Sequence, residues 1–253
     1  MENNIKIYNN DCFFVMEELI KEGKKVDMIL CDLPYNVTKN HWDKDIIDLE
    51  KLWECYNKLI KDNGAIVLFG QDKFTIKLMM SNIKNHRYNL IWDKVLPSGF
   101  LNANRMPLRV HEDICVFYKK LPVYNVQKKK GKPNHSKGKE KEYINNNYGD
   151  FNFVDNVEKL GDMKHPKSIL TYQKPHPSKC NHPTEKPVEL LEFLIKSYTN
   201  KDDIVLDNCM GSGSTGVACL NTNRRFIGIE KEEKYFEISK DRLLKAWREK
   251  YGE

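Results

Sequence analysis

Short apolar runs and longer amphipathic stretches alternate along this chain, a pattern typical of alternating strands and helices. Apolar runs predict strands at residues 5–8, 26–31, 65–69, 88–92, 114–118, 204–206 and 225–229. Amphipathic spacing predicts helices at residues 13–21, 49–60, 72–83, 188–198, 215–220 and 232–249. This alternation favours an α/β fold, in which a mixed, mostly parallel sheet carries helices on both faces.

A glycine-rich turn connects the strand at 204–206 to the helix at 215–220. Asp207 ends the strand, and glycines follow at positions 211, 213 and 216. Glu230 ends the next apolar run, so each of the two strands carries an acid at its tip. A strand, glycine turn, helix and strand in this order is typical of a site for a cofactor that contains a nucleoside.

Two features of this unit favour S-adenosylmethionine over a dinucleotide as the cofactor. The charge of Asp207 would repel a pyrophosphate, but it would attract an ammonium or a sulfonium. Only 23 residues follow Glu230, so the remaining strands of the sheet must come from the N-terminal half, in permuted order. S-adenosylmethionine carries an amino group, a sulfonium and a ribose diol, which suit a carboxylate on each strand. A dinucleotide remains the alternative cofactor. The structural alternative is a glycine turn that binds no cofactor and only packs a helix on a strand.

A second motif, residues 32–35, directly follows the strand at 26–31. Pro34 has no N–H and a fixed φ, so it stiffens the turn and gives the Leu33 carbonyl a defined direction. Asp32 and that carbonyl can together accept both hydrogens of an exocyclic amine, while Tyr35 stacks on its ring. The simpler interpretation is a turn that ends a strand, with Asp32 as a capping residue.

Residues 32–36 resemble the Asp-Pro-Pro-Tyr-Asn catalytic motif of the S-adenosylmethionine-dependent DNA amino-methyltransferases. The position of this motif upstream of the glycine-rich turn resembles the β-class arrangement, and the resemblance covers most of the chain. It implies a Rossmann-like methyltransferase fold with permuted motif order. Leu33 stands where the family usually has its first proline; because a backbone carbonyl acts there, we expect leucine to be tolerated. The catalytic residues implied are Asp32, Leu33, Pro34 and Tyr35.

Two further elements of the family have counterparts in this sequence. Residues 182–187 resemble the element His-Pro-Thr-Gln-Lys-Pro, with Glu185 in place of the usual glutamine. Asp11 and Cys12 match an N-terminal Asp-Cys element that lies near the cofactor's adenine, although Asp11 also suits the N-cap of the helix that follows. The resemblance implies a cofactor-binding set of Asp11, Cys12, Thr184, Lys186, Asp207, Gly211, Ser212, Gly213, Ser214, Thr215 and Glu230.

A basic segment with nine lysines and one acid runs from Lys119 to Lys141. An aromatic-rich stretch, residues 143–172, follows it, and cations interleaved with aromatics suit contacts with nucleic acid. A solvated loop is the alternative on charge alone. By position the segment resembles the family's target-recognition region, so we expect a catalytic domain of residues 1–118 and 176–253 and an inserted region at 119–175. The candidate DNA contacts are Arg105, Arg109, Lys128, Lys129, Lys130 and Lys132.

The expected reaction is methyl transfer from S-adenosylmethionine to adenine N6 in a specific sequence of double-stranded DNA, with base flipping. Cytosine-N4 methylation is the closest alternative; Asp32 favours adenine because an initial serine is commoner in the cytosine-N4 enzymes. A DNA-binding protein of the same fold without turnover is a further alternative, and the intact motif argues against it. Methylation of a ring carbon would need a thiolate nucleophile, usually in a Pro-Cys context, and no cysteine here follows a proline.

The composition indicates the cellular compartment in which this reaction takes place. The 253 residues carry a net charge of +6, with no apolar run near 18 residues and no signal peptide at the start, so we expect a cytoplasmic protein without a membrane. The seven scattered cysteines predict reduced thiols, and no CxxC pair exists, so we expect no metal. Zinc bound by Cys180, His176 and His182 is the alternative, but no second cysteine lies nearby. Family resemblance adds a cognate restriction endonuclease and a homodimer as candidate partners. The whole interpretation requires Asp32 and the glycine-rich turn to meet at one edge of the sheet.

Overall fold

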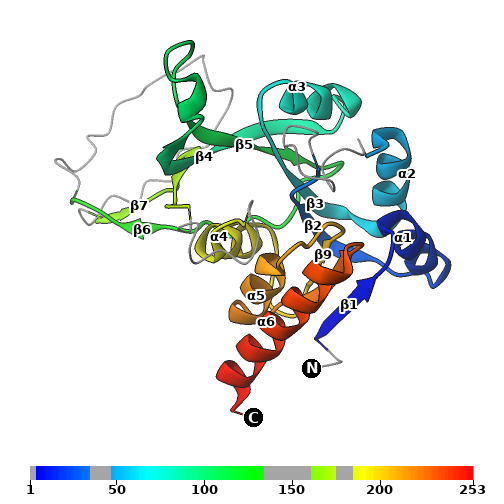
Figure 1. The fold of residues 1–253 in the computed structure, drawn as a ribbon. Helices are drawn as coiled ribbons and strands as arrows, with labels where there is room; N and C mark the ends of the chain where they lie inside the picture. Colours follow the sequence, from blue (N-terminus) through cyan, green and yellow to red (C-terminus); the bar gives the residue numbers. More distant parts are fainter. Residues whose placement is uncertain (1–3, 35–46, 134–160, 175–184, 253) are drawn as a thin grey trace. The chain divides into compact units, whose positions relative to one another are not determined.

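The computed structural model describes residues 4–34, 47–133, 161–174 and 185–252 (Figure 1). The chain forms two compact units. The larger unit comprises residues 1–125 and 168–253, and the smaller comprises residues 126–167.

The larger unit is built on a mixed sheet of eight strands in the order β1-β10-β9-β2-β3-β5-β4-β8. The neighbours from β1 to β3 are all parallel, whereas β5 is antiparallel to both β3 and β4. This arrangement confirms the mixed, mostly parallel sheet expected from the sequence. The strands are β1 (Ile5–Asn9), β2 (Val26–Cys31), β3 (Ile60–Gly70), β4 (His86–Ser98), β5 (Arg109–Phe117), β8 (Ile169–Thr171), β9 (Ile204–Asp207) and β10 (Arg225–Glu230).

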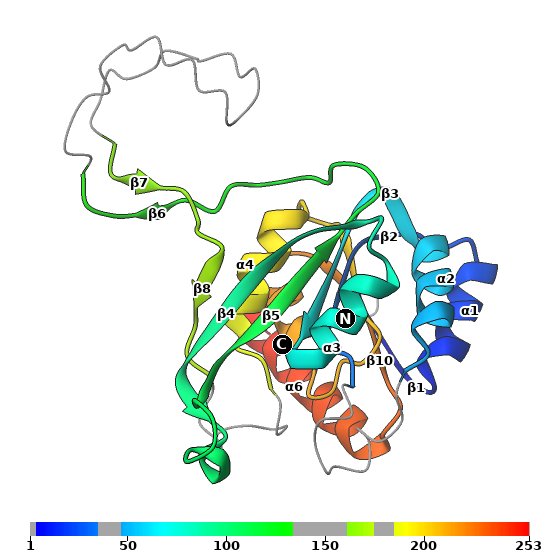
Figure 2. The same ribbon diagram turned by 90° about the horizontal axis from the view of Figure 1, so that it is seen from above.

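Helices cover both faces of this sheet (Figures 1 and 2). Alternate side chains of β2 enter two different cores, as the pleat of a strand requires. Ile29 belongs to the core under α1, α2 and α3, and Leu30 to the core under α4, α5 and α6. The helices are α1 (Cys12–Lys21), α2 (Leu49–Leu59), α3 (Asp72–Ser81), α4 (Val188–Tyr198), α5 (Ser214–Asn221) and α6 (Glu233–Tyr251).

The strand order is permuted relative to the sequence, as expected. The late strands β9 and β10 lie between the early strands β1 and β2: Phe226 is paired with Ile5, and Leu206 with Ile29. In the sheet, β9 has β10, the next strand along the chain, as one neighbour and the early strand β2 as the other. The order therefore reverses between β9 and β2, which is where open α/β sheets bind ligands, at the carboxyl ends of the strands.

The hairpin of β4 and β5 is longer than its apolar runs predicted. Its strands span residues 86–98 and 109–117, and pairing continues through Asp93 and His111 to Ser98 and Arg109. These outer positions are polar or exposed, so hydrophobic periodicity did not reveal them. The three-residue strand β8 was not predicted; it pairs in parallel with β4, Ile169 opposite Ile91.

The smaller unit is a short antiparallel pair of strands, β6 (Lys129–Lys130) and β7 (Met163–Lys164). The Gly131 N–H donates to the Asp162 carbonyl at 2.7 Å. This unit is narrower than the inserted region expected at 119–175, because residues 168–174 contain β8 and belong to the larger unit. The intervening residues 134–160 lie outside the described structure.

None of the helices in the described part of the chain is long and apolar enough to cross a membrane.

Candidate active site

Two acidic strand ends lie side by side at the carboxyl edge of the sheet. Asp32 follows β2 and Asp207 ends β9, and these strands are paired in parallel, so both acids fall on the same edge. The two carboxylates are close enough that the charge of Asp32 contributes to the raised pKa of Asp207. The structure thus brings the Asp32 motif and the glycine-rich turn together, as the interpretation of the sequence required.

Asp207 is buried and hydrogen-bonded within the turn that follows it. Its carboxylate accepts a hydrogen bond from the Thr215 hydroxyl at 2.6 Å and another from the Cys209 N–H at 3.1 Å. Burial raises the pKa of Asp207 to about 6, although these hydrogen bonds favour the charged form. The carboxylate is therefore ionised at neutral pH and protonates in mild acid.

Backbone conformation explains two of the glycines in the turn. Gly211 and Gly213 have φ values of 51° and 76°, in the left-handed region that favours glycine. A Cβ on Gly213 would also lie 3.0 Å from the Cβ of Ser239 on α6. The turn can therefore follow this path closely against α6 only with glycine at position 213.

Glu230, at the end of the neighbouring strand β10, is hydrogen-bonded to the glycine-rich turn. One carboxylate oxygen accepts a hydrogen bond from the Gly211 N–H and the other from the Glu232 N–H, each at 2.9 Å. Burial raises the pKa of Glu230, and the backbone hydrogen bonds oppose that shift. The tips of β9 and β10 are thus joined, and each presents an acid to the same edge.

Glu185, which stands in place of the family's glutamine, is held by an arginine from the last helix. Its carboxylate lies 2.7 Å from a guanidinium nitrogen of Arg242 and 3.4 Å from the Ser212 hydroxyl. Arg242 also donates to the Ser214 hydroxyl at 3.0 Å. The apolar face of the last helix indicated packing alone, so the sequence interpretation missed Arg242. The glutamate at 185 was the signal, because a buried acid requires a partner.

Lys186 lies between two carboxylates. Its ammonium donates to the Asp32 carboxylate and lies 3.4 Å from an oxygen of Glu112, whose other oxygen is 3.3 Å from the Lys94 ammonium. Lys94 and Lys186 are both buried. The Lys186 ammonium also lies 4.9 Å from the ring centre of Phe69. The sequence indicates no chemistry for Glu112 or Lys94, because their positions in β5 and β4 show their proximity to Asp32 only once the sheet is assembled.

Neighbouring opposite charges keep Lys186 and Glu112 ionised. Burial alone would lower the pKa of Lys186, but Asp32 and Glu112 raise it overall. Burial would likewise raise the pKa of Glu112, but Lys186 and Lys94 lower it. The Glu112 oxygen beside Lys186 makes no hydrogen bond to the described residues, so it is held by the ion pair. Lys186 therefore acts as a cation rather than as a base.

The N-terminal pair of candidate residues lies near the same edge. The Asp11 carboxylate accepts hydrogen bonds from the Phe13 and Phe14 N–H groups at 2.9 and 3.3 Å, so it caps α1. A hydrogen bond with Cys209, together with burial, raises the pKa of the Cys12 thiol. Cys12 is thus adjacent to the segment that follows Asp207.

The remaining candidates are placed differently. Leu33 is buried in the core under α1 to α3, so at this position leucine contributes packing. Tyr35 and Thr184 lie outside the described residues. Arg105 is exposed, and Arg109 lies 3.2 Å from the Asp72 carboxylate. Four candidates are exposed and belong to the smaller unit: Lys128, Lys129, Lys130 and Lys132.

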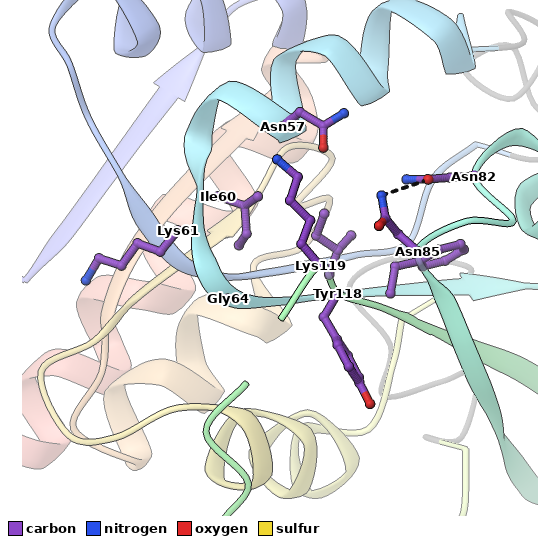
Figure 3. Close-up of a pocket in the computed structure, with 10 residues that line it drawn as sticks. Asn57, Ile60, Lys61, Gly64, Asn82, Asn85, Tyr118 and Lys119 are labelled. Carbon is purple, nitrogen blue, oxygen red and sulfur yellow. Dashed lines mark hydrogen bonds between the residues drawn. The ribbon is translucent and has the colours of Figure 1, made fainter. Parts of the chain in front are cut away.

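A small pocket lies at the opposite edge of the sheet, where β3 begins and β5 ends (Figure 3). Its lining includes Lys61 and Lys119, and Asn85 donates to Asn82 at 3.0 Å beside it. Because parallel strands carry their functional groups at their carboxyl ends, this pocket is separate from the site at Asp32 and Asp207.

Comparison with known proteins agrees with this geometry. Residues 26–241 match the model of a family described as DNA methylase, with N6 and N4 specificity in its name. The type II methyltransferase M2.MboI of Moraxella bovis is 28% identical and is matched over 95% of this chain and 88% of its own length. The DNA adenine methyltransferase YhdJ of Escherichia coli is 26% identical over 87% of this chain and 77% of its own. The crystal structure of the M1.HpyAVI–SAM complex is 30% identical, with a TM-score of 0.67 and coverage of 94% and 98%.

Proposed function

Since the chain belongs to the DNA methylase family, we propose that it methylates adenine N6 at a specific sequence in double-stranded DNA. The expected family, its fold and its cofactor, S-adenosylmethionine, are confirmed by the comparisons. The observation that carries the proposal is the position of Asp32 beside Asp207, on adjacent parallel strands at one edge. A motif that binds an amine thereby faces a motif that suits a cationic cofactor.

The residues at this edge fit S-adenosylmethionine. When bound, the cofactor supplies its methyl group from an electrophilic sulfonium. Asp207 and the turn at 211–215 would hold the methionine end, because a buried carboxylate attracts its cationic groups. Glu230 would accept the ribose hydroxyls, and Asp11 and Cys12 would lie near the adenine. The expected contact of Thr184 with the carboxylate end of the cofactor stays a prediction.

The Asp32 motif prepares the target amine. Adenine N6 is a poor nucleophile because its lone pair is delocalised into the ring. By accepting both amine hydrogens, Asp32 and the Leu33 carbonyl would draw the nitrogen toward tetrahedral geometry and localise that pair. Pro34 keeps the turn stiff, and Tyr35 is expected to stack on the flipped base. Catalysis then depends on positioning and fixed charges, without a covalent intermediate.

Lys186 would position Asp32 for this task. The ion pair fixes one carboxylate oxygen and so sets the orientation of the group. Two lysines, 94 and 186, balance two acids, 32 and 112, so the buried group as a whole is neutral and Asp32 is kept as an acceptor. This role differs from the expected contact of Lys186 with the cofactor, and variants at this position separate the two.

Two observations favour adenine over cytosine. A relative with 26% identity is named a DNA adenine methyltransferase. The motif begins with Asp32, whereas serine is commoner at this position in the cytosine-N4 enzymes that the motif resembles.

The DNA contacts are expected from two parts of the chain. Lys128, Lys129, Lys130 and Lys132 are exposed in the smaller unit and suit phosphate contacts. Arg105 and Arg109 belong to the β4–β5 hairpin. A cytoplasmic setting and a cognate restriction endonuclease stay predictions from the family resemblance. Analytical ultracentrifugation would test the expected homodimer.

A single assay tests the proposed reaction. The protein is incubated with labelled S-adenosylmethionine and unmethylated DNA, and the DNA is digested to nucleosides. Label in N6-methyladenine is the expected result, whereas label in N4-methylcytosine would replace adenine with the alternative substrate. Sequencing the methylated bases in DNA from expressing cells then gives the recognition site.

A further inference from the structure

The tip of the β4–β5 hairpin, residues 95–110, exposes an unusual number of apolar side chains. Leu101 is fully exposed at 101%, Phe100 is 65% exposed and Met106 is 49% exposed. Phe100 and Leu101 belong to a single 3-10 turn, residues 100–102, which follows Gly99 in the left-handed region. Exposed apolar side chains that are grouped in this way are typical of an interaction surface.

The tip extends past the edge that carries Asp32. At the end of β3, Gly70 is paired with Asp113, so residues 109–112 of β5 and the loop before them lie beyond β3. Asp32 follows Cys31, which is paired with Leu68 near the same end of β3. The hairpin therefore projects outward from the edge where the target base must arrive (Figures 1 and 2).

The base of the hairpin is fixed to the catalytic group. Lys94 and Glu112 lie on its two strands, and Glu112 is ion-paired with the lysine that holds Asp32. Nearer the tip, Arg109 is ion-paired with Asp72 of α3, and the Ser98 hydroxyl donates to the Arg109 carbonyl at 3.2 Å. The tip is thus carried on strands whose position relative to Asp32 is set by buried charges.

The composition of the tip indicates which partner it fits. Within the tip, residues 95–110, the sequence has two cations, Arg105 and Arg109, and no acid. Exposed apolar side chains among cations are what DNA-deforming proteins present to the duplex: the cations contact phosphates and the apolar groups enter between base pairs.

We propose that Phe100 and Leu101 form an apolar wedge that enters the duplex next to the target base and stabilises its flipped state. The proposal rests on the proposed function and adds a surface to it. A flipped base leaves a gap in the stack. Phe100 and Leu101 would fill that gap while Asp32, at the sheet edge from which the hairpin projects, receives the base.

The test compares two duplexes that contain the recognition site, one fully paired and one with a mismatch opposite the target adenine. A mismatched base is easier to flip, so it needs the wedge less. For Phe100→Ala/Leu101→Ala we expect kcat/KM on the paired duplex to fall by roughly tenfold to a hundredfold. On the mismatched duplex we expect most of that loss to disappear. Fluorescence of 2-aminopurine at the target position should show less flipping by the variant on the paired duplex.

A matched control is Ile76→Ala/Met80→Ala, which removes two apolar side chains of α3 that are 62% and 65% exposed. It should leave both duplexes unaffected. Equal loss on both duplexes, or no loss at all, would overturn the wedge. So would a loss that coincides with dissociation of a dimer in sedimentation, since the tip would then be a protein interface. The wild-type rate in the same assay reports separately on the proposed function.

Discussion

The catalytic edge lies beside the middle of the β4–β5 hairpin and the tip lies at its end, and the two regions are built in opposite ways. At the edge, Asp207, Lys94 and Lys186 are buried and each has a charged or hydrogen-bonding partner. At the tip, Phe100 and Leu101 are apolar and exposed. Chemistry on an amine requires charges that are held in place before the substrate arrives. Binding a duplex requires groups that only the duplex will bury.

The largest effect is expected from Asp32→Ala, which removes the acceptor from the catalytic edge. Transfer should fall by at least about a thousandfold, because the amine loses its main preorganised partner. Binding of S-adenosylmethionine, measured by calorimetry, should stay near the wild-type value. A variant that transfers methyl at the normal rate would show that the amine is bound elsewhere.

A smaller loss is expected from Lys186→Met, which leaves Asp32 without its fixed partner. We expect kcat to fall by roughly tenfold to a hundredfold through misplacement of the carboxylate. Loss of the Lys186 charge should also raise the pKa of Glu112, because that charge helps to hold this pKa below its ordinary value.

Lys186→Arg is the matched control for this prediction, because it keeps the charge and should restore part of kcat. Affinity for S-adenosylmethionine separates the two roles of Lys186. If Lys186→Met weakens cofactor binding while kcat at saturation is unchanged, the lysine contacts the cofactor and does not position Asp32.

Cofactor affinity should depend on pH through Asp207. Burial raises its pKa to about 6, so the carboxylate is charged above this pH and neutral below it. Attraction for the cofactor's cationic groups is therefore lost as the pH falls, and the Kd should rise by up to about tenfold for each pH unit below 6. Calorimetric titrations at several pH values measure this dependence, and Asp207→Asn should bind weakly at every pH. If the pH dependence of the Kd persists in Asp207→Asn, a group other than Asp207 causes it.

The smallest effect is expected from the basic residues of the smaller unit. Replacing lysines 128, 129, 130 and 132 by glutamine should weaken DNA binding at low salt and reduce its salt dependence. The logarithmic slope should decrease by up to about 0.9 for each phosphate that the variant no longer neutralises. Replacing four exposed lysines of the larger unit by glutamine controls for net charge: Lys6, Lys58, Lys234 and Lys245. Fluorescence anisotropy over a range of salt concentrations measures the slope. An unchanged slope would mean that these lysines do not bind phosphates.

The family, the fold and the two motifs that meet at the catalytic edge could be predicted from the amino-acid sequence. These features are encoded locally: an apolar run shows where a strand ends, Asp32 and Asp207 mark its tip, and Gly211 and Gly213 mark a turn of left-handed backbone. The permuted strand order was predicted from the order of the motifs, because the Asp32 motif precedes the glycine-rich turn in the chain. Such features could be predicted because a few consecutive residues decide them.

The pairing of the charges and the length of the hairpin depend on how the chain packs and could not be predicted from the sequence. Lys186 is 154 positions from Asp32, and Arg242 belongs to a helix whose pattern indicated packing alone. Glu112 lies in a strand that joins the sheet in antiparallel orientation, so its closeness to Lys186 depends on register. Contacts between distant segments have no local pattern; they are set when strands and helices pack, and the positioning of Asp32 therefore became visible only in the folded chain.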